Sequence, residues 1–215
     1  YIVRLMPDKG SNMDENKFYG KRVLVTGASS GIGRATALKY PEAGADVIAT
    51  ARRAEELDRV KVEAEPLCGS IEVVPGDITK SAFVTELAAV ADPVDVLVNC
   101  AGMLGHGPFL DTDADEWPKV WELNVQATMR LSQAIARGMR DRGSGHIVIV
   151  TSILAGKVYR FTLPYAATKH ALRAIRTGLR MELAEFGIKV TEVAPGLTDT
   201  PILRSFENDD AAADY

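Results

Sequence analysis

The sequence predicts an α/β fold, a single domain of three layers with a doubly wound parallel sheet between two layers of helices. Short apolar runs alternate with longer helical patterns along the chain, which is the order that a parallel sheet requires. A glycine-rich turn joins the first apolar run to the first helical pattern. The 215 residues, 47% of them hydrophobic, suit one domain with a substantial core.

Six strands and five helices are expected in alternation. The strands are expected at 22–26, 46–50, 71–74, 94–99, 146–151 and 189–193. The helices are expected at 32–43, 53–64, 80–91, 114–141 and 164–186. Runs such as Arg22-Val23-Leu24-Val25 are typical of strands covered on both faces. Because ligands of such sheets bind at the carboxyl ends of the strands, residues that follow the strands should share one crevice.

The turn after the first strand reads Thr26-Gly27-Ala28-Ser29-Ser30-Gly31-Ile32-Gly33. Glycines let backbone N–H groups approach a pyrophosphate, and the N-terminus of the following helix favours its negative charge. The turn lacks the Gly-Lys-Ser/Thr ending of nucleotide-triphosphatase loops. We therefore expect a dinucleotide here, although glycine-rich turns without a ligand are also common.

Tyr165 and Lys169 are four residues apart on an expected helix, so they share one face of it. A free tyrosine has a pKa of about 10, and a nearby positive charge lowers that pKa. The pair could therefore exchange protons with a substrate, although exposed helices also carry such pairs by chance. Ser152 follows the strand at 146–151 and should reach the same crevice.

In combination these motifs resemble the classical short-chain dehydrogenase/reductase family, which has a Rossmann-type fold, from about Lys21 to Pro201. The resemblance implies a catalytic tetrad of Asn124, Ser152, Tyr165 and Lys169. The cofactor contacts that the glycine turn and the resemblance imply are Gly27, Ser29, Ser30, Gly31, Ile32, Gly33, Asp77, Ile78, Asn99, Ala101, Gly102, Tyr165, Lys169, Pro195, Gly196, Thr198 and Thr200. Cys100 departs from the Asn-Asn-Ala-Gly pattern of the family.

The end of the second strand indicates which cofactor is used. An acid there would bind the ribose 2′-hydroxyl of NAD(H), whereas an arginine accepts the 2′-phosphate of NADP(H). This chain has no acid there and continues with Arg52 and Arg53. We expect NADP(H) rather than NAD(H), with Arg52 as the main contact and Arg53 or Arg34 assisting. The alternative is that both arginines simply begin a solvated helix.

The expected reaction interconverts a ketone and a secondary alcohol. Ser152 would donate a hydrogen bond to the carbonyl oxygen and Tyr165 would transfer the proton. Lys169 and the oxidised nicotinamide would hold Tyr165 toward phenolate. In the family, the asparagine that Asn124 matches binds a water that links the lysine to solvent.

The substrate itself is not readable from the sequence. Ser152, Tyr165, Leu154 and Phe161 are its expected contacts. Further apolar residues that follow the motifs are Met103, Leu104, Ile153 and Leu197, which favours a partly apolar substrate. Lys157 and Arg160 could meet an acidic substrate or could simply be exposed charges.

Two other functions compete with this one. A dinucleotide-binding regulator or scaffold with weak catalysis would keep the fold without turnover. The extended branch of the same superfamily acts on nucleotide sugars, but it uses a different glycine spacing and a larger C-terminal domain, and this chain has neither.

Composition limits the remaining classes. The net charge of −4 gives no electrostatic case for nucleic acid, and no apolar run approaches the roughly 20 residues that span a bilayer. Cys68 and Cys100 form no disulfide framework, and neither the cysteines nor the histidines have metal-ligand spacing. We expect a cytoplasmic protein that binds no metal, and the resemblance implies a homodimer or homotetramer formed through helices 114–141 and 164–186.

The two ends look unlike the rest. We interpret residues 1–20 as an N-terminal extension, part of which an expression vector could have supplied, and 21–215 as the dinucleotide-binding domain. The family continues after 189–193 with a last helix and strand, which we expect to be missing from this sequence. We expect the residues after Phe206 to form a loop that closes over substrate and supplies no catalytic group.

Overall fold

The computed structural model describes residues 17–202. The expectations for residues 1–16 and for the loop after Phe206 lie outside the described residues.

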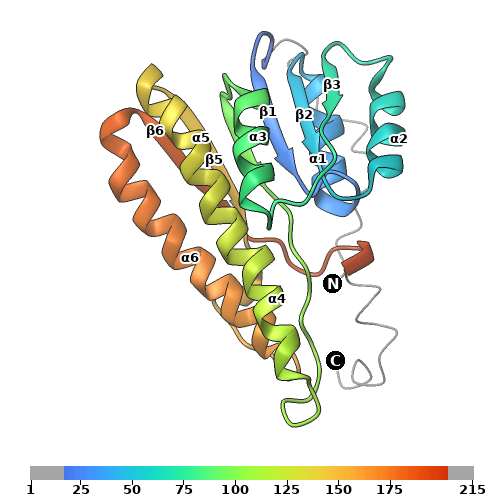
Figure 1. Ribbon diagram of the computed structural model, residues 1–215, viewed down its shortest axis with the longest axis vertical. Coiled ribbons are helices and arrows are strands. Elements are labelled where there is room, and N and C mark those ends of the chain that lie inside the picture. Colours follow the sequence, from blue (N-terminus) through green and yellow to red (C-terminus); the bar gives the residue numbers. More distant parts are fainter. Residues whose placement is uncertain (1–16, 203–215) are drawn as a thin grey trace.

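Within residues 17–202, six parallel strands form the sheet, in the order β3-β2-β1-β4-β5-β6 (Figure 1). The strands are β1 (Arg22–Thr26), β2 (Asp46–Thr50), β3 (Ser70–Val73), β4 (Val96–Asn99), β5 (Gly145–Val150) and β6 (Ile188–Val193). The helices are α1 (Gly31–Glu42), α2 (Ala54–Ala64), α3 (Ser81–Ala91), α4 (Trp117–Trp121), α5 (Thr128–Arg142) and α6 (Leu163–Leu183). The expected α/β class and the doubly wound parallel sheet are confirmed.

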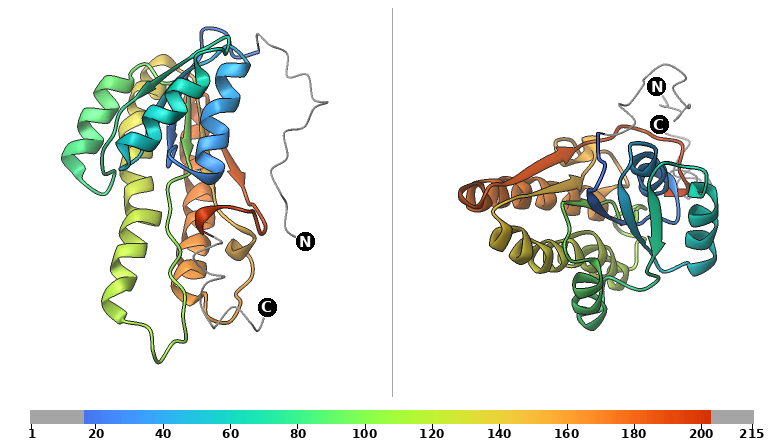
Figure 2. Two further views of the ribbon diagram at one scale, coloured as in Figure 1. Left: turned by 90° about the vertical axis from the view of Figure 1, so that its right-hand side faces the viewer. Right: turned by 90° about the horizontal axis from the view of Figure 1, so that it is seen from above.

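Helices cover both faces of the sheet (Figure 2). Successive strand residues point to opposite faces, so each buried strand supplies two layers of core. Leu24, Leu97 and Ile147 pack toward α3, α5 and α6. Val23, Val47 and neighbouring residues pack toward α1 and α2. The near-continuous apolar runs in the strands are explained by this two-sided burial.

The expected single helix at 114–141 is wrong in detail, because the structure divides it. A 3-10 turn at Ala114–Glu116 leads into α4, and a π-helical segment, η2 (Glu122–Ala127), joins α4 to α5. A π-helical segment accommodates an extra residue in the helical ladder, and such segments are frequent at functional sites. The segment turns Asn124 into the interior, where it is 1% exposed.

The register brings the strand ends to one edge. Thr26 pairs with Thr50 across β1 and β2, and Val150 pairs with Val193 across β5 and β6. The loops that carry the motifs therefore leave the sheet from the same side. Among residues 17–202, no helix has the length and apolar content to cross a bilayer.

Candidate functional site

A cavity of about 780 Å³ opens at the carboxyl edge of the strands. The expected site residues that line it are Gly27, Ser29, Ser30, Gly31, Ile32, Gly33, Arg52, Asp77, Ile78, Ala101, Gly102, Ser152, Leu154, Tyr165, Lys169, Pro195, Gly196, Thr198 and Thr200. Its volume lies within the roughly 300–1,000 Å³ of typical ligand pockets. Asn99, Asn124 and Phe161 do not line it.

The glycine turn at the start of α1 has no room for a side chain at Gly27 or Gly33. Gly27 has a φ of +68°, and a Cβ there would lie 2.9 Å from the Cα of Ala101. A Cβ on Gly33 would collide with the carbonyl oxygen of Gly27. The first turn of α1 contains no acidic residue, and its N-cap residue Ser30 makes no side-chain capping bond. The N-terminal N–H groups of α1 therefore remain suited to an anion.

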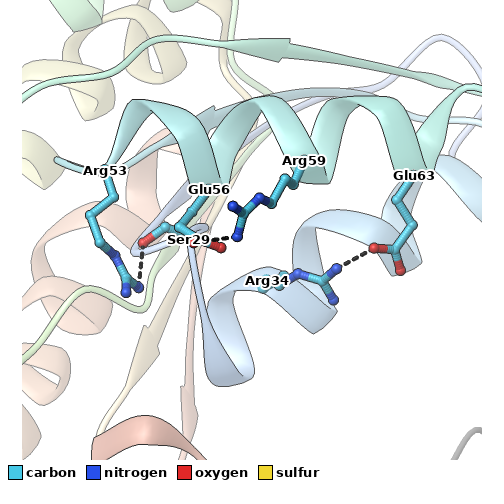
Figure 3. Close-up of polar contacts among 6 residues, drawn as sticks. All are labelled: Ser29, Arg34, Arg53, Glu56, Arg59 and Glu63. Atoms are coloured by element: carbon cyan, nitrogen blue, oxygen red, sulfur yellow. Dashed lines mark hydrogen bonds and ion pairs between the residues drawn. The ribbon is translucent and has the colours of Figure 1, made fainter.

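Three arginines near this turn differ in their partners, and Figure 3 shows two of them, Arg34 and Arg53. Arg34 is paired with Glu63 on α2, so its guanidinium is already engaged. Arg53 donates to the Ser29 hydroxyl at 3.1 Å, which fixes it against the glycine turn. Arg52 is exposed and lines the cavity, and within residues 17–202 it makes no hydrogen bond or ion pair.

Asp77 follows β3 and lines the cavity together with Arg52, which follows the neighbouring strand β2. Burial raises the pKa of its carboxyl, but hydrogen bonds from the Thr79 N–H and hydroxyl, at 3.0 and 2.8 Å, and the charge of Arg52 outweigh burial and lower that pKa. Asp77 is therefore ionised at neutral pH.

The reactive groups come from the loop after β5 and from α6. Ser152 is 8% exposed, and its hydroxyl oxygen accepts the Leu154 N–H at 3.2 Å. Tyr165 and Lys169 lie one helical turn apart, and the Lys169 Nζ is 5.3 Å from the centre of the Tyr165 ring. The same Nζ donates to the carbonyl oxygen of Val150 at 3.0 Å, so the end of β5 holds the lysine in place.

Burial controls the pKa values at this end of the cavity. It raises the pKa of Tyr165 to about 12, although a hydrogen bond from Ser152 acts in the opposite direction. It lowers the pKa of Lys169 to about 8. The expectation that Lys169 lowers the Tyr165 pKa is therefore wrong for the chain by itself, because desolvation of the phenolate is the larger effect. At neutral pH Tyr165 is a neutral proton donor.

The Asn124 side chain is held by hydrogen bonds to Met103 and Thr168. Its Nδ2 donates to the Met103 carbonyl at 3.0 Å and to the Thr168 hydroxyl at 3.1 Å, and its Oδ1 accepts the Met103 N–H at 2.8 Å. The Thr168 hydroxyl in turn donates to the Tyr165 carbonyl at 2.7 Å. Because both amide protons are used, the side-chain nitrogen is not available to a water. Asn124 thereby ties η2 to the loop after β4 and to α6, and its expected role in binding a water stays a prediction.

Two expected contacts lie elsewhere. The Asn99 amide is directed into the core, where it donates to the Ser132 hydroxyl of α5 at 3.0 Å, so it is a structural group. Phe161 has a φ of +64°, and its ring lies under the Arg160 guanidinium at 4.9 Å, outside the cavity lining. Neither position could be read from the motif, because the path of the flanking loop decides where each side chain points.

Several lining residues were not expected. They are Thr50, Ala51, Gly76, Cys100, Leu123, Val150, Thr151, Tyr159, Thr162, Pro201 and Ile202. Most directly adjoin an expected residue, so extending each motif by one position would have found them. Burial raises the pKa of the Cys100 thiol to about 11 against the opposing charge of Lys169, which makes it a neutral packed group. Within residues 17–202 no His, Cys, Asp and Glu cluster could hold a metal ion.

Comparisons with known proteins agree with this geometry. The family model for short chain dehydrogenases matches residues 21–211. An uncharacterized oxidoreductase of Staphylococcus aureus (strain USA300) is 36% identical over 194 residues, which cover 88% of this chain and 83% of the relative.

Two solved structures are also similar. A short-chain dehydrogenase from Streptomyces avermitilis is 41% identical with a TM-score of 0.76, and the match covers 81% of this chain but 65% of that one. The chain thus spans slightly less than two thirds of the length of that dehydrogenase. A putative NAD(P) dependent gluconate 5-dehydrogenase from Beutenbergia cavernae with bound NADP is 35% identical with a TM-score of 0.85, over 93% of this chain and 81% of that one.

Proposed function

The chain belongs to the short-chain dehydrogenase family, and from that premise we propose that it uses NADP(H) to interconvert a ketone and a secondary alcohol. The observation that carries the proposal is the meeting of Ser152, Tyr165 and Lys169 with the glycine turn in one cavity. As a member of this family the chain is an NAD(P)-dependent oxidoreductase.

The residues present fit a nicotinamide dinucleotide. The glycines of the turn and the uncapped start of α1 suit its pyrophosphate. A Cβ on Gly31 would lie 3.0 Å from the Thr200 methyl group, so the segment after β6 covers this turn. Thr198 and Thr200 can donate to the phosphates from that side, and Asp77 with Ile78 can bracket the adenine.

The proposed preference for NADP(H) rests on Arg52. It lines the cavity at the end of β2 with no competing ion pair among the described residues, whereas Arg34 is engaged with Glu63. Arg53 holds Ser29 and leaves a second positive charge beside the same site. Two guanidinium groups and no acid at the end of β2 favour the 2′-phosphate.

The protein groups divide the proton chemistry between them. The Ser152 hydroxyl donates to Tyr165 in the chain by itself, and when substrate is bound it can donate the same proton to the carbonyl oxygen of the substrate. The neutral Tyr165 then gives its phenolic proton to that oxygen in the reduction direction. The charged Lys169 stabilises the phenolate that remains, and the reverse order serves oxidation. The nicotinamide, when bound, supplies or accepts the hydride.

We further propose a homodimer or homotetramer formed through α5 and α6, as the family pattern implies. Met129 on α5 and Met181 on α6 are 49% and 76% exposed, which supports an apolar contact at these helices. Light scattering should give twice or four times the chain mass, and Met181→Lys should lower it.

Single-turnover mixing with NADPH and a panel of ketones tests the proposed function. Loss of NADPH absorbance together with formation of the alcohol would support it. NADPH binding without any turnover across the panel would favour a dinucleotide-binding regulator instead.

A further inference from the structure

We infer that the substrate is an uncharged ketone with apolar substituents rather than a keto acid or a sugar acid. The inference rests on the proposed function and concerns the part of the cavity beside Ser152 and Tyr165. It departs from the gluconate specificity named for the similar Beutenbergia cavernae protein.

Charge is confined to one side of the cavity. Among residues 17–202, the charged side chains that line it are Arg52, Arg53, Asp77 and Lys169. The first three follow β2 and β3, at the opposite end of the sheet order from β5 and β6. Lys169 is fully buried, and its Nζ already donates to Val150. No other described cation of the lining remains to pair with a substrate carboxylate near the reactive hydroxyls.

The opposite side of the cavity carries large apolar side chains beside its hydroxyl groups. Its side chains come from the loop after β4, from η2 and from the loops after β5 and β6, and they are Leu104, Leu123, Ile153, Leu154, Tyr159 and Leu197. Four separate segments thus place large apolar groups in the part of the cavity that contains the hydroxyls of Ser152 and Tyr165. Convergence of this kind is typical of a site for an apolar ligand.

Three of these side chains remain exposed at the cavity. Ile153 and Tyr159 are each 41% exposed, and Leu197 is 50% exposed. Large apolar groups that gather in the open beside a cavity mark a binding surface, because a ligand that covers them removes them from water. Ile153 and Leu197 would give a charged group no compensating hydrogen bond, and Tyr159 would offer at most its one hydroxyl and no positive charge.

The nearby cations do not change this distribution. Lys157 and Arg160 belong to the same loop as Tyr159, but neither lines the cavity. The Arg160 guanidinium lies over the Phe161 ring, and the Phe161 carbonyl accepts the Gly107 N–H at 2.8 Å, which fixes this part of the loop. The possibility that these cations meet an acidic substrate is therefore disfavoured.

Methyl levulinate and levulinate test the inference, because they share one ketone and differ in charge at a remote position. We expect kcat/KM with NADPH to be larger for the ester by about a hundredfold, since the carboxylate would be desolvated without a partner. Along the methyl ketones from butanone to octanone, kcat/KM should rise about threefold to fourfold per methylene. An acid used as well as its ester, or a flat series, would overturn the inference.

Calorimetric binding to the protein–NADP⁺ complex separates this inference from the proposed reaction. Tighter binding of the ester without turnover would support the substrate class and contradict the reaction. Equal binding of acid and ester, or binding of neither, would contradict the substrate class whatever the outcome of turnover.

A matched pair of variants locates the effect. Leu154→Arg places a cation in the lining and should raise the ratio of acid to ester kcat/KM by about tenfold or more. Val158→Arg adds the same charge four residues away, at a side chain that is 58% exposed and outside the lining, and should leave the ratio unchanged. Equal shifts in both variants, or no shift in Leu154→Arg while it still binds NADPH, would overturn the inference.

Discussion

The two halves of the cavity are lined by side chains of different chemistry. The half at the ends of β1, β2 and β3 carries the glycine turn, two arginines and an ionised carboxyl. The half at the ends of β4, β5 and β6 carries the hydroxyl groups of Ser152 and Tyr165 and the buried Lys169, with large apolar side chains around them. The residues that bind the charged groups of the cofactor are therefore separated along the sheet from those that transfer the proton. Substitutions in one half of the cavity should leave the function of the other half largely intact.

The largest effect is expected at the reactive hydroxyl. Tyr165→Phe removes the proton donor and should lower kcat by about 10²–10⁴-fold, the range for a general acid. The NADPH dissociation constant, measured by fluorescence titration, should stay within about threefold, because Tyr165 lies in the other half. Near wild-type kcat would remove Tyr165 from the proton-transfer role, and a large loss of NADPH binding would break the separation.

The next effect depends on pH. The pKa of Lys169 is lowered to about 8, so Lys169 is charged below that pH and neutral above it. The kcat/KM for reduction should therefore fall as pH rises through about 8, by up to tenfold per unit. The Tyr165 pKa of about 12 predicts no second break near neutrality.

Lys169→Arg is the control for this assignment, because an arginine stays protonated across this range. It should flatten the fall in kcat/KM above pH about 8, whatever its absolute rate. A fall that persists in Lys169→Arg would assign the titration to another group.

In the charged half, Arg52→Ala should weaken NADPH binding by about tenfold, because a charge-assisted bond to the 2′-phosphate is lost. NADH affinity and the saturated kcat should change little. Arg59→Ala is the matched control, since Arg59 is an exposed arginine of α2 paired with Glu56 and does not line the cavity. Equal weakening of NADPH and NADH in Arg52→Ala would show that Arg52 does not read the phosphate.

The smallest effect is expected where the two halves meet. Ser132→Ala removes the partner of Asn99 and should lower the free energy of unfolding by about 1–3 kcal/mol, because a buried amide is left unpaired. Urea denaturation measures this change. NADPH affinity and kcat should stay at wild-type values. A changed NADPH affinity would indicate that Asn99 contributes to the cofactor site after all.

The sequence carries unequal information about the two halves. The bounds of β1 and β2 were predicted without error, since buried parallel strands read as short apolar runs and the turn between β1 and α1 must be rich in glycine. That Tyr165 and Lys169 lie on the same face of one helix followed from helical periodicity alone. These features are local, so the sequence contains them.

The features that could not be predicted depend on tertiary contacts. The spacing of apolar residues does not predict the π-helical segment around Asn124, because the partners of the Asn124 side chain, Met103 and Thr168, lie far away in sequence. The positions of Asn99 and Phe161 depend on which way a loop turns. The raised Tyr165 pKa follows from burial, which spacing does not reveal.

Isotope transfer tests the central claim most directly. NADPH carrying deuterium at its transferable position is mixed with the protein and methyl levulinate or octanone, and the alcohol is analysed by mass spectrometry. The account predicts one deuterium on the carbinol carbon for the wild type and almost none for Tyr165→Phe over the same time. An alcohol without deuterium, or bound NADPH that transfers no label to either ketone, would contradict the account.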